Sequence, residues 1–272
     1  LYHYCTPETL LALCSFGTLR FSDVFAMNDF MEVHWGYQTW EKAAGEVLGT
    51  VGKEFLDAID TIIHHSGIQV LPLASCFSRN GDVLSQWRAY GADGRGYAVG
   101  FDPKLLVQLP VRALKVEYDH RTQIEEIKQF VLALHEVEAT EPTPRSSRFF
   151  EACARLACDL AAFKNPAFSE EDEVRLVHIL NFKKSNDSLK LVDPGGTSFG
   201  VDTPPQQVKF RMSGSTPVAY LDMDFTNGAA VRPMVEVVLG PKNDSLPSGV
   251  SVLLETLSHS GVRLRKSRAS YR

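Results

Sequence analysis

The stretch Lys164-Asn-Pro-Ala-Phe-Ser-Glu-Glu-Asp-Glu-Val-Arg-Leu176 lies near the middle of the chain and decides how the rest is interpreted. It begins with an Asn-Pro turn signal and continues into an alternating run that reaches Leu180. Side chains of a β-strand point to opposite faces with a period of two, so Glu171, Glu173 and Arg175 should share one face of a strand. The other face of this strand is mostly apolar and suits the core of a sheet.

Two interpretations of this charged face compete. It can be the edge of a sheet, where solvated charges discourage aggregation. Alternatively, it can be a site in which Glu173 is held by Arg175 or Lys164 and points into a cleft. A carboxylate placed in that way can stabilise positive charge that develops on a sugar carbon, or orient a hydroxyl. The spacing alone supports both interpretations equally.

Length and composition are those of an ordinary globular protein. The chain has 272 residues, enough for one large domain or two small ones, with 44% hydrophobic and 22% charged residues. Its net charge of -5 gives no global attraction to nucleic acid, so any contact with a phosphate backbone requires a local patch. No apolar run approaches the ~20 residues that cross a bilayer, and no signal peptide is visible. We therefore expect a cytoplasmic protein without a membrane partner.

Cysteine and histidine usage predicts neither disulfides nor a metal site. The five cysteines are odd in number and form no CxxC pair, which is typical of reduced thiols. The eight histidines are scattered and form no HExxH motif, so no metal cofactor is expected.

The remaining pattern predicts an α+β fold in a single domain, residues 1–272, with a helical insert at about 119–163. Thr6 and Asp82 should cap the helices that follow them, and Asn28-Asp29 should form a turn. Strands are expected at residues 1–4, 18–22, 68–78, 96–101, 111–118, 173–180, 207–212, 219–222, 233–239 and 261–266. Helices are expected at residues 8–16, 37–65, 83–90, 120–138, 147–163 and 249–259, with a short one after Pro103.

Three groups of motifs follow one another along the chain. They are Leu1-Tyr-His-Tyr-Cys-Thr6 with Leu19-Arg-Phe-Ser22 and Asn28-Asp29, then Ser75-Cys-Phe-Ser78 with Gln86-Trp-Arg-Ala-Tyr90 and Gly96, and then Lys164 and Phe168 with Glu171-x-Glu173-x-Arg175. Together they resemble a widespread bacterial family named only as a domain of unknown function. The likeness extends to Gly240-Pro241 and to the ending Ser267 to Arg272, so it covers nearly the whole chain.

This family in turn resembles remote members of the ADP-ribosyltransferase superfamily. The resemblance implies a split antiparallel or mixed β-core of ADP-ribosyltransferase type that holds NAD as a substrate. It implies a transferase that passes ADP-ribose to a macromolecular acceptor, protein or nucleic acid, or an NAD glycohydrolase. A toxin or an antiviral defence effector is one role for such an enzyme.

The resemblance also assigns residues. Glu173 would be catalytic, and Glu171 would position the acceptor nucleophile. The nucleotide-binding residues implied by the resemblance are His3, Thr6, Ser22, Ser78 and Tyr90. On chemical grounds we add an aromatic wall for the flat nicotinamide from Tyr4, Trp87 or Tyr90, and Arg175 as a phosphate ligand. The resemblance does not decide which residue contacts the ribose, His3 or its neighbours Tyr4, Cys5 and Thr6. Ser75 competes with Ser22 and Ser78 for the position of the implied serine. Chemically, the pyrophosphate requires an arginine, for which Arg20, Arg88 or Arg175 are available.

Each assignment has a structural alternative, and two other functions compete. His3 between two tyrosines is typical of a packed histidine, and Trp87 and Tyr90, three positions apart, are typical of the core face of a helix. An acidic pair on a strand can also bind Mg²⁺, as in a metal-dependent nuclease, although no Asp…Glu-x-Lys arrangement surrounds Glu171. The third possibility is a non-catalytic interaction module.

Overall fold

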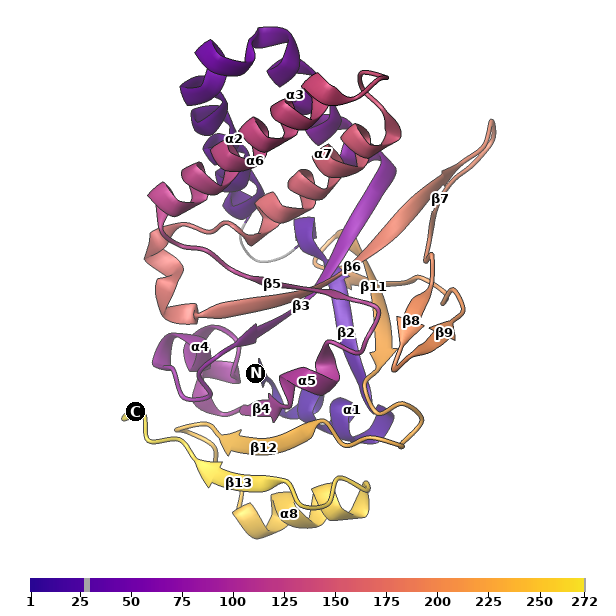
Figure 1. Ribbon diagram of the computed structural model, residues 1–272. Helices are drawn as coiled ribbons and strands as arrows, with labels where there is room; N and C mark the ends of the chain where they lie inside the picture. Colours follow the sequence, from indigo (N-terminus) through magenta and orange to yellow (C-terminus); the bar gives the residue numbers. More distant parts are fainter. Residues whose placement is uncertain (27–29, 272) are drawn as a thin grey trace.

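The computed structural model describes residues 1–26 and 30–271, with the backbone alone at 30–33 and 66–69. One large, mostly antiparallel sheet forms its centre, and the four longest helices gather at one end (Figure 1). The predicted α+β class is confirmed. The strands are β1 (Tyr2–Cys5), β2 (Thr18–Asp23), β3 (Val70–Ser78), β4 (Tyr97–Phe101), β5 (Arg112–Lys115), β6 (Glu173–Lys184), β7 (Leu189–Val192), β10 (Lys209–Ser213), β11 (Thr216–Asp224), β12 (Met234–Leu239) and β13 (Arg263–Lys266), with a separate hairpin of β8 (Gly196–Ser198) and β9 (Val201–Thr203).

The sheet divides into two arms along one edge of β3. Its path runs β10-β11-β2-β3-β1-β4-β12-β13, and β6 pairs with β3 over residues 70–78. On the edge away from β6, β2 pairs only with Leu73 and Ala74, and β1 only with Ser78. Residues 75–77 therefore lie between two diverging arms, one built of β2, β11 and β10 and the other of β1, β4, β12 and β13. We call this gap the split.

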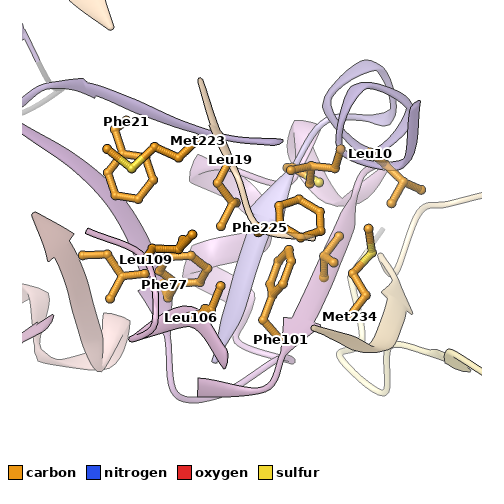
Figure 2. Close-up of a cluster of buried hydrophobic side chains, with 14 of the residues drawn as sticks. Leu10, Leu19, Phe21, Phe77, Phe101, Leu106, Leu109, Met223, Phe225 and Met234 are labelled. Atoms are coloured by element: carbon orange, nitrogen blue, oxygen red, sulfur yellow. The ribbon is translucent and has the colours of Figure 1, made fainter. Parts of the chain in front are cut away.

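An apolar core covers the face of the sheet that carries Phe77 (Figure 2). Leu73 and Leu176 also belong to this core. Helices α1 (Pro7–Phe16) and α8 (Pro247–Thr256) contribute buried side chains to it. Aromatic rings join the two arms here, because Phe101 lies 6.0 Å from Phe77 and 5.3 Å from Phe225 between ring centroids. The short helix α5 (Pro103–Leu106) adds Leu106.

The helices at the other end form a unit with its own core, drawn at the top of Figure 1. It consists of α2 (Phe30–Val51), α3 (Lys53–Gln69), α6 (His120–Thr140) and α7 (Ser147–Asp159). Trp40, Phe55, Ile127 and Phe149 are among its buried side chains. The expected insert at 119–163 supplies only half of this helical unit, because the other half lies between β2 and β3.

Local signals predicted the first elements well. Thr6 caps α1 by accepting from the Thr9 N–H at 3.3 Å, and Gly17 ends that helix in the left-handed region at φ 60°. Asp82 was expected to cap α4 (Leu84–Ala89) and does not, because Val83 holds that position without a side-chain cap. Asp82 instead binds the Trp87 indole. The predicted turn at Asn28-Asp29 lies outside the described residues.

The structure excludes one alternative for the charged stretch and corrects one expectation. β6 is not an edge strand, since β3 pairs with one of its edges and β5 and β7 with the other. Glu171 does not lie on the strand but ends the 3₁₀ segment η4 (Pro166–Glu171). Asp172 then turns the chain in the left-handed region at φ 44°, a conformation that Asp tolerates better than most residues, and β6 begins at Glu173.

Candidate functional site

A cavity of about 890 Å³ lies at the split, on the face of the sheet opposite the apolar core. Directly paired residues of antiparallel strands project to the same face. The register pairs Ser78 with Glu173, and Cys76 with Arg175. It also pairs Ser22 with Ala74. Period-two alternation on three strands, β2, β3 and β6, therefore brings these polar side chains to one surface, and all of them line the cavity.

The charged end of the cavity is an interlocked ion-pair cluster of Lys164, Glu171, Glu173 and Arg175. Arg175 binds Glu173 through two nitrogens, Nε at 2.8 Å from Oε1 and Nη2 at 3.0 Å from Oε2. Lys164 Nζ lies 3.2 Å from Glu173 Oε2 and also donates to Glu171. Lys164, Glu173 and Arg175 are each less than 8% exposed. The expectation that Lys164 or Arg175 holds Glu173 is confirmed, because both do.

The surrounding backbone fixes this cluster in place. The Glu173 N–H donates to the Tyr118 hydroxyl at 3.1 Å, and Arg175 Nη1 donates to the Ala161 carbonyl at 2.6 Å. Lys164 Nζ lies 5.0 Å from the centroid of the Phe168 ring, a cation–π distance. The site thus joins β6 to both ends of the segment that carries α6 and α7.

Glu173 is ionised at neutral pH. Burial raises the pKa of its carboxyl, but the Arg175 guanidinium, the Lys164 ammonium and a hydrogen bond from the Cys76 side chain outweigh burial and lower that pKa to about 2. Burial, followed by the Glu173 charge, raises the pKa of the Cys76 thiol. Burial and the Glu171 carboxylate raise the pKa of Tyr90 to about 12. The cavity therefore presents a fixed carboxylate beside a neutral thiol and a neutral phenol.

The remaining walls are aromatic and cationic. Tyr90 and Phe168, both 38% exposed, flank the acidic end. Arg20 on β2 and Arg211 on β10 line the side of the cavity that lies across β3 from β6. Arg20 forms an ion pair with Asp222 at 2.9 Å. Since β10 lies four strands from β6 in the sheet order, roughly 19 Å of sheet separates the strand of Arg211 from the strand of Glu173, whereas the strand of Arg20 lies half as far away.

Most of the predicted site residues meet at this cavity. The residues brought together are His3, Tyr4, Ser22, Ser78, Tyr90, Glu171, Glu173 and Arg175. His3 alternates with its tyrosine neighbours and so lies toward the core side of the sheet. There its ring packs 5.5 Å from Phe77, and Nδ1 lies 2.9 Å from the Cys76 carbonyl oxygen. Ser75, the competing serine, also lines the cavity, and its buried Oγ has no hydrogen-bond partner among the described residues.

Two predicted ligand residues lie elsewhere. Trp87 is fully buried, does not line the cavity, donates from Nε1 to Asp82 at 2.8 Å and packs edge-on against Tyr4 at 4.8 Å. Its role is therefore in packing, the alternative that helical spacing favoured. Thr6 caps α1 and does not line the cavity either, although Thr9 does. Tyr4 is a lining residue whose hydroxyl is committed to the backbone, donating to the Asn80 carbonyl and accepting from the Val83 N–H, each at 2.9 Å.

Several lining residues were not predicted as ligands from the sequence. They include Gln86, Phe168, Arg211 and Ser213. Gln86 had a signal, since it lies four residues before Tyr90, a spacing that places two side chains on one face of a helix. Arg211 and Ser213 had none, because only the pairing of β10 with β11 brings that strand to the cavity.

The described residues contain no group of three or more His, Cys, Asp and Glu side chains that could hold a metal ion. Within the same residues, no helix combines the length and the apolar character needed to cross a membrane. All five cysteines are free thiols in the structure.

Comparison with known proteins finds a family match for about a third of the chain. Residues 86–176 match the family described as "Protein of unknown function (DUF2971)", which confirms the resemblance to a domain-of-unknown-function family over that stretch. The match begins at α4 and ends within β6, so it contains Tyr90, Lys164, Glu171, Glu173 and Arg175. No curated protein matches the chain, and no solved structure does.

Proposed function

We propose that this protein is an NAD-consuming enzyme of ADP-ribosyltransferase type that breaks the bond between nicotinamide and ribose. The observation that carries the proposal is the cavity at the split, where an ionised Glu173 faces aromatic and cationic walls. Its volume lies within the range of about 300–1,000 Å³ that is typical of small-molecule sites. A sheet with two diverging arms also suits the split β-core expected of this superfamily.

Glu173 would stabilise the reacting ribose. Cleavage of the N-glycosidic bond builds positive, oxocarbenium-like charge on the sugar, which a fixed carboxylate stabilises. Arg175 and Lys164 already donate three hydrogen bonds to Glu173, and Cys76 supplies another. A thiol is a weak donor, so a ribose hydroxyl can replace Cys76 as a stronger one. Glu173 would then accept from the 2′-hydroxyl without losing either cation.

The other walls fit the rest of NAD. Tyr90 and Phe168 present aromatic surface beside the carboxylates, which suits the flat nicotinamide ring, in place of the buried Trp87. Arg20 and Arg211 suit the pyrophosphate, because guanidinium groups bind phosphate oxygens through paired hydrogen bonds. Glu171, less buried than Glu173, would position the acceptor nucleophile, which is a macromolecule in a transferase and water in a glycohydrolase.

Nicotinamide release from NAD by the purified protein tests this function. We expect turnover by the wild type and a loss of about 10²–10³-fold in Glu173→Gln. Glu170→Gln is the matched control, since Glu170 is exposed and lies on the same segment as Glu171. Thermal shifts with NAD and with free ADP-ribose that do not add when both are present would support binding of the two at one site. Wild-type protein that neither binds nor consumes NAD would overturn the proposal.

A further inference from the structure

The segment that carries α6 and α7 leaves and rejoins the sheet through a short stem, residues 117–118 and 162–164. The Glu117 N–H donates to the Ala162 carbonyl at 2.9 Å, and the Lys164 N–H donates to the Glu117 carbonyl at 3.1 Å. A parallel bridge between Glu117 and Phe163 completes this pairing. The stem therefore places its last residue, Lys164, in the ion-pair cluster.

One buried side chain ties the two strands of the stem together. Gln123 on α6 is 0% exposed, and its Nε2 donates to the Glu117 carbonyl at 2.6 Å and to the Lys164 carbonyl at 2.9 Å. A primary amide has two N–H donors, so one reaches each strand. Its Oε1 accepts from Trp35 Nε1 of α2 at 3.0 Å, which fixes the orientation of the amide.

We propose that Gln123 is a positioning residue, which holds the backbone of Lys164 where its ammonium reaches Glu171 and Glu173. The Lys164 carbonyl is held by Gln123, while the Lys164 ammonium is held by the two carboxylates. The backbone of Lys164 is thereby fixed from the helical unit, and its side chain spans the short remaining distance to the cavity. A fully satisfied buried network of this kind specifies one arrangement of its members.

The catalytic consequence rests on the proposed function, because it assumes that Glu173 must be held in its charged, oriented state. If the amide no longer holds the stem, the ammonium of Lys164 should sample positions away from Glu173. Arg175 would remain in place, since its contacts to Glu173 and Ala161 do not involve Gln123.

Chemical labelling of Lys164 tests the placement without any assay of activity. An ammonium buried in two ion pairs reacts slowly with acetic anhydride. In Gln123→Met, which keeps the length of the side chain and removes the amide, we expect Lys164 to be acylated roughly tenfold faster, while exposed Lys53 is unchanged. Gln129→Met is the matched control, because Gln129 is exposed on the same helix and donates to Glu125 of that helix at 3.1 Å, away from the stem. Unchanged labelling of Lys164, with lowered stability alone, would reduce Gln123 to a packing role and overturn the proposal.

A double-mutant cycle in nicotinamide release tests the catalytic step. If Gln123 acts through Lys164, then Gln123→Met combined with Lys164→Met should have the same kcat as Lys164→Met alone. Additive losses would overturn this coupling. If the wild type consumes no NAD, the proposed function fails, while the labelling result still decides whether Gln123 places Lys164. Should Gln123→Met not fold, Trp35→Phe removes the donor that orients the amide and should produce a smaller increase in labelling.

Discussion

Arg175 lies two positions after Glu173 on the same face of β6 and binds both of its carboxylate oxygens, at 2.8 and 3.0 Å. This spacing requires a strand, since residues two apart on a helix point in different directions. The pair is buried, and Lys164 and Glu171 complete a cluster with two positive and two negative charges. Balanced charge explains how four ionised groups can occupy the wall of a cavity.

Removal of one partner from the buried pair of Arg175 and Glu173 should strongly lower the stability of the protein. Arg175→Met leaves Glu173 in the interior with Lys164 as its remaining cation, and we expect a loss of about 3–5 kcal/mol in the free energy of unfolding. The control is Arg20→Met, because the ion pair of Arg20 with Asp222 is exposed and should contribute at most about 1 kcal/mol. Urea unfolding midpoints of the two variants check this difference. Equal midpoints would mean that the Arg175 pair is no more important than a surface pair.

The low pKa of Glu173 predicts how stability depends on pH. The ordinary Glu value is 4.5 and that of Glu173 is about 2, so its contribution is fully present above about pH 4.5 and is lost as the pH falls toward 2. The difference corresponds to about 3 kcal/mol. The stability gap between wild type and Glu173→Gln should therefore narrow when unfolding is measured at successively lower pH. A gap that stays constant down to about pH 3 would contradict this assignment.

Local rules predicted the parts of the fold and site that depend on local sequence. Alternation in the charged stretch predicted that Glu173 and Arg175 share a face, and the Thr-Pro start and Gly17 stop predicted α1. Trp87 is a residue for which local rules were insufficient. Helical spacing brings Trp87 and Tyr90 to neighbouring positions, but it does not say which of the two faces the cavity.

The rest of the site depends on contacts between distant segments. Arg211 reaches the cavity only because β10 pairs with β11 and β11 pairs with β2, a register that no local pattern contains. The helical unit likewise joins α2 and α3 to α6 and α7 across a long stretch of sequence. Asp172 turns the chain before β6 begins, so Glu171 lies on a 3₁₀ segment and not on the strand. Period-two alternation therefore misplaced the backbone of Glu171. The Glu171 side chain nevertheless accepts a hydrogen bond from Lys164 in the site.

Variants at Trp87 and Tyr90 should separate stability from binding. Trp87→Phe loses the hydrogen bond to Asp82 in the interior, and we expect about 1–3 kcal/mol less stability with an unchanged KM for NAD. Tyr90→Ala removes an exposed aromatic wall, and we expect a KM for NAD that is about three- to tenfold higher with little change in stability. Thermal unfolding and steady-state nicotinamide release measure both quantities. The reverse pattern would show that Trp87, not Tyr90, contacts the nucleotide.

Arg211 should bind the charged part of the substrate. It is exposed on β10, lines the cavity and lies across β3 from the carboxylates, so its guanidinium is available to a pyrophosphate. Arg211→Gln should weaken NAD binding about tenfold, which corresponds to one charge-assisted hydrogen bond, and should leave the unfolding midpoint unchanged. Because the contact is solvent-exposed, salt should weaken binding in the wild type more steeply than in the variant. Titration calorimetry with NAD at low and high salt measures both effects, with Lys190→Gln on the distant β7 as the control. Equal affinity and equal salt dependence in wild type and Arg211→Gln would exclude the β10 side of the cavity from nucleotide binding.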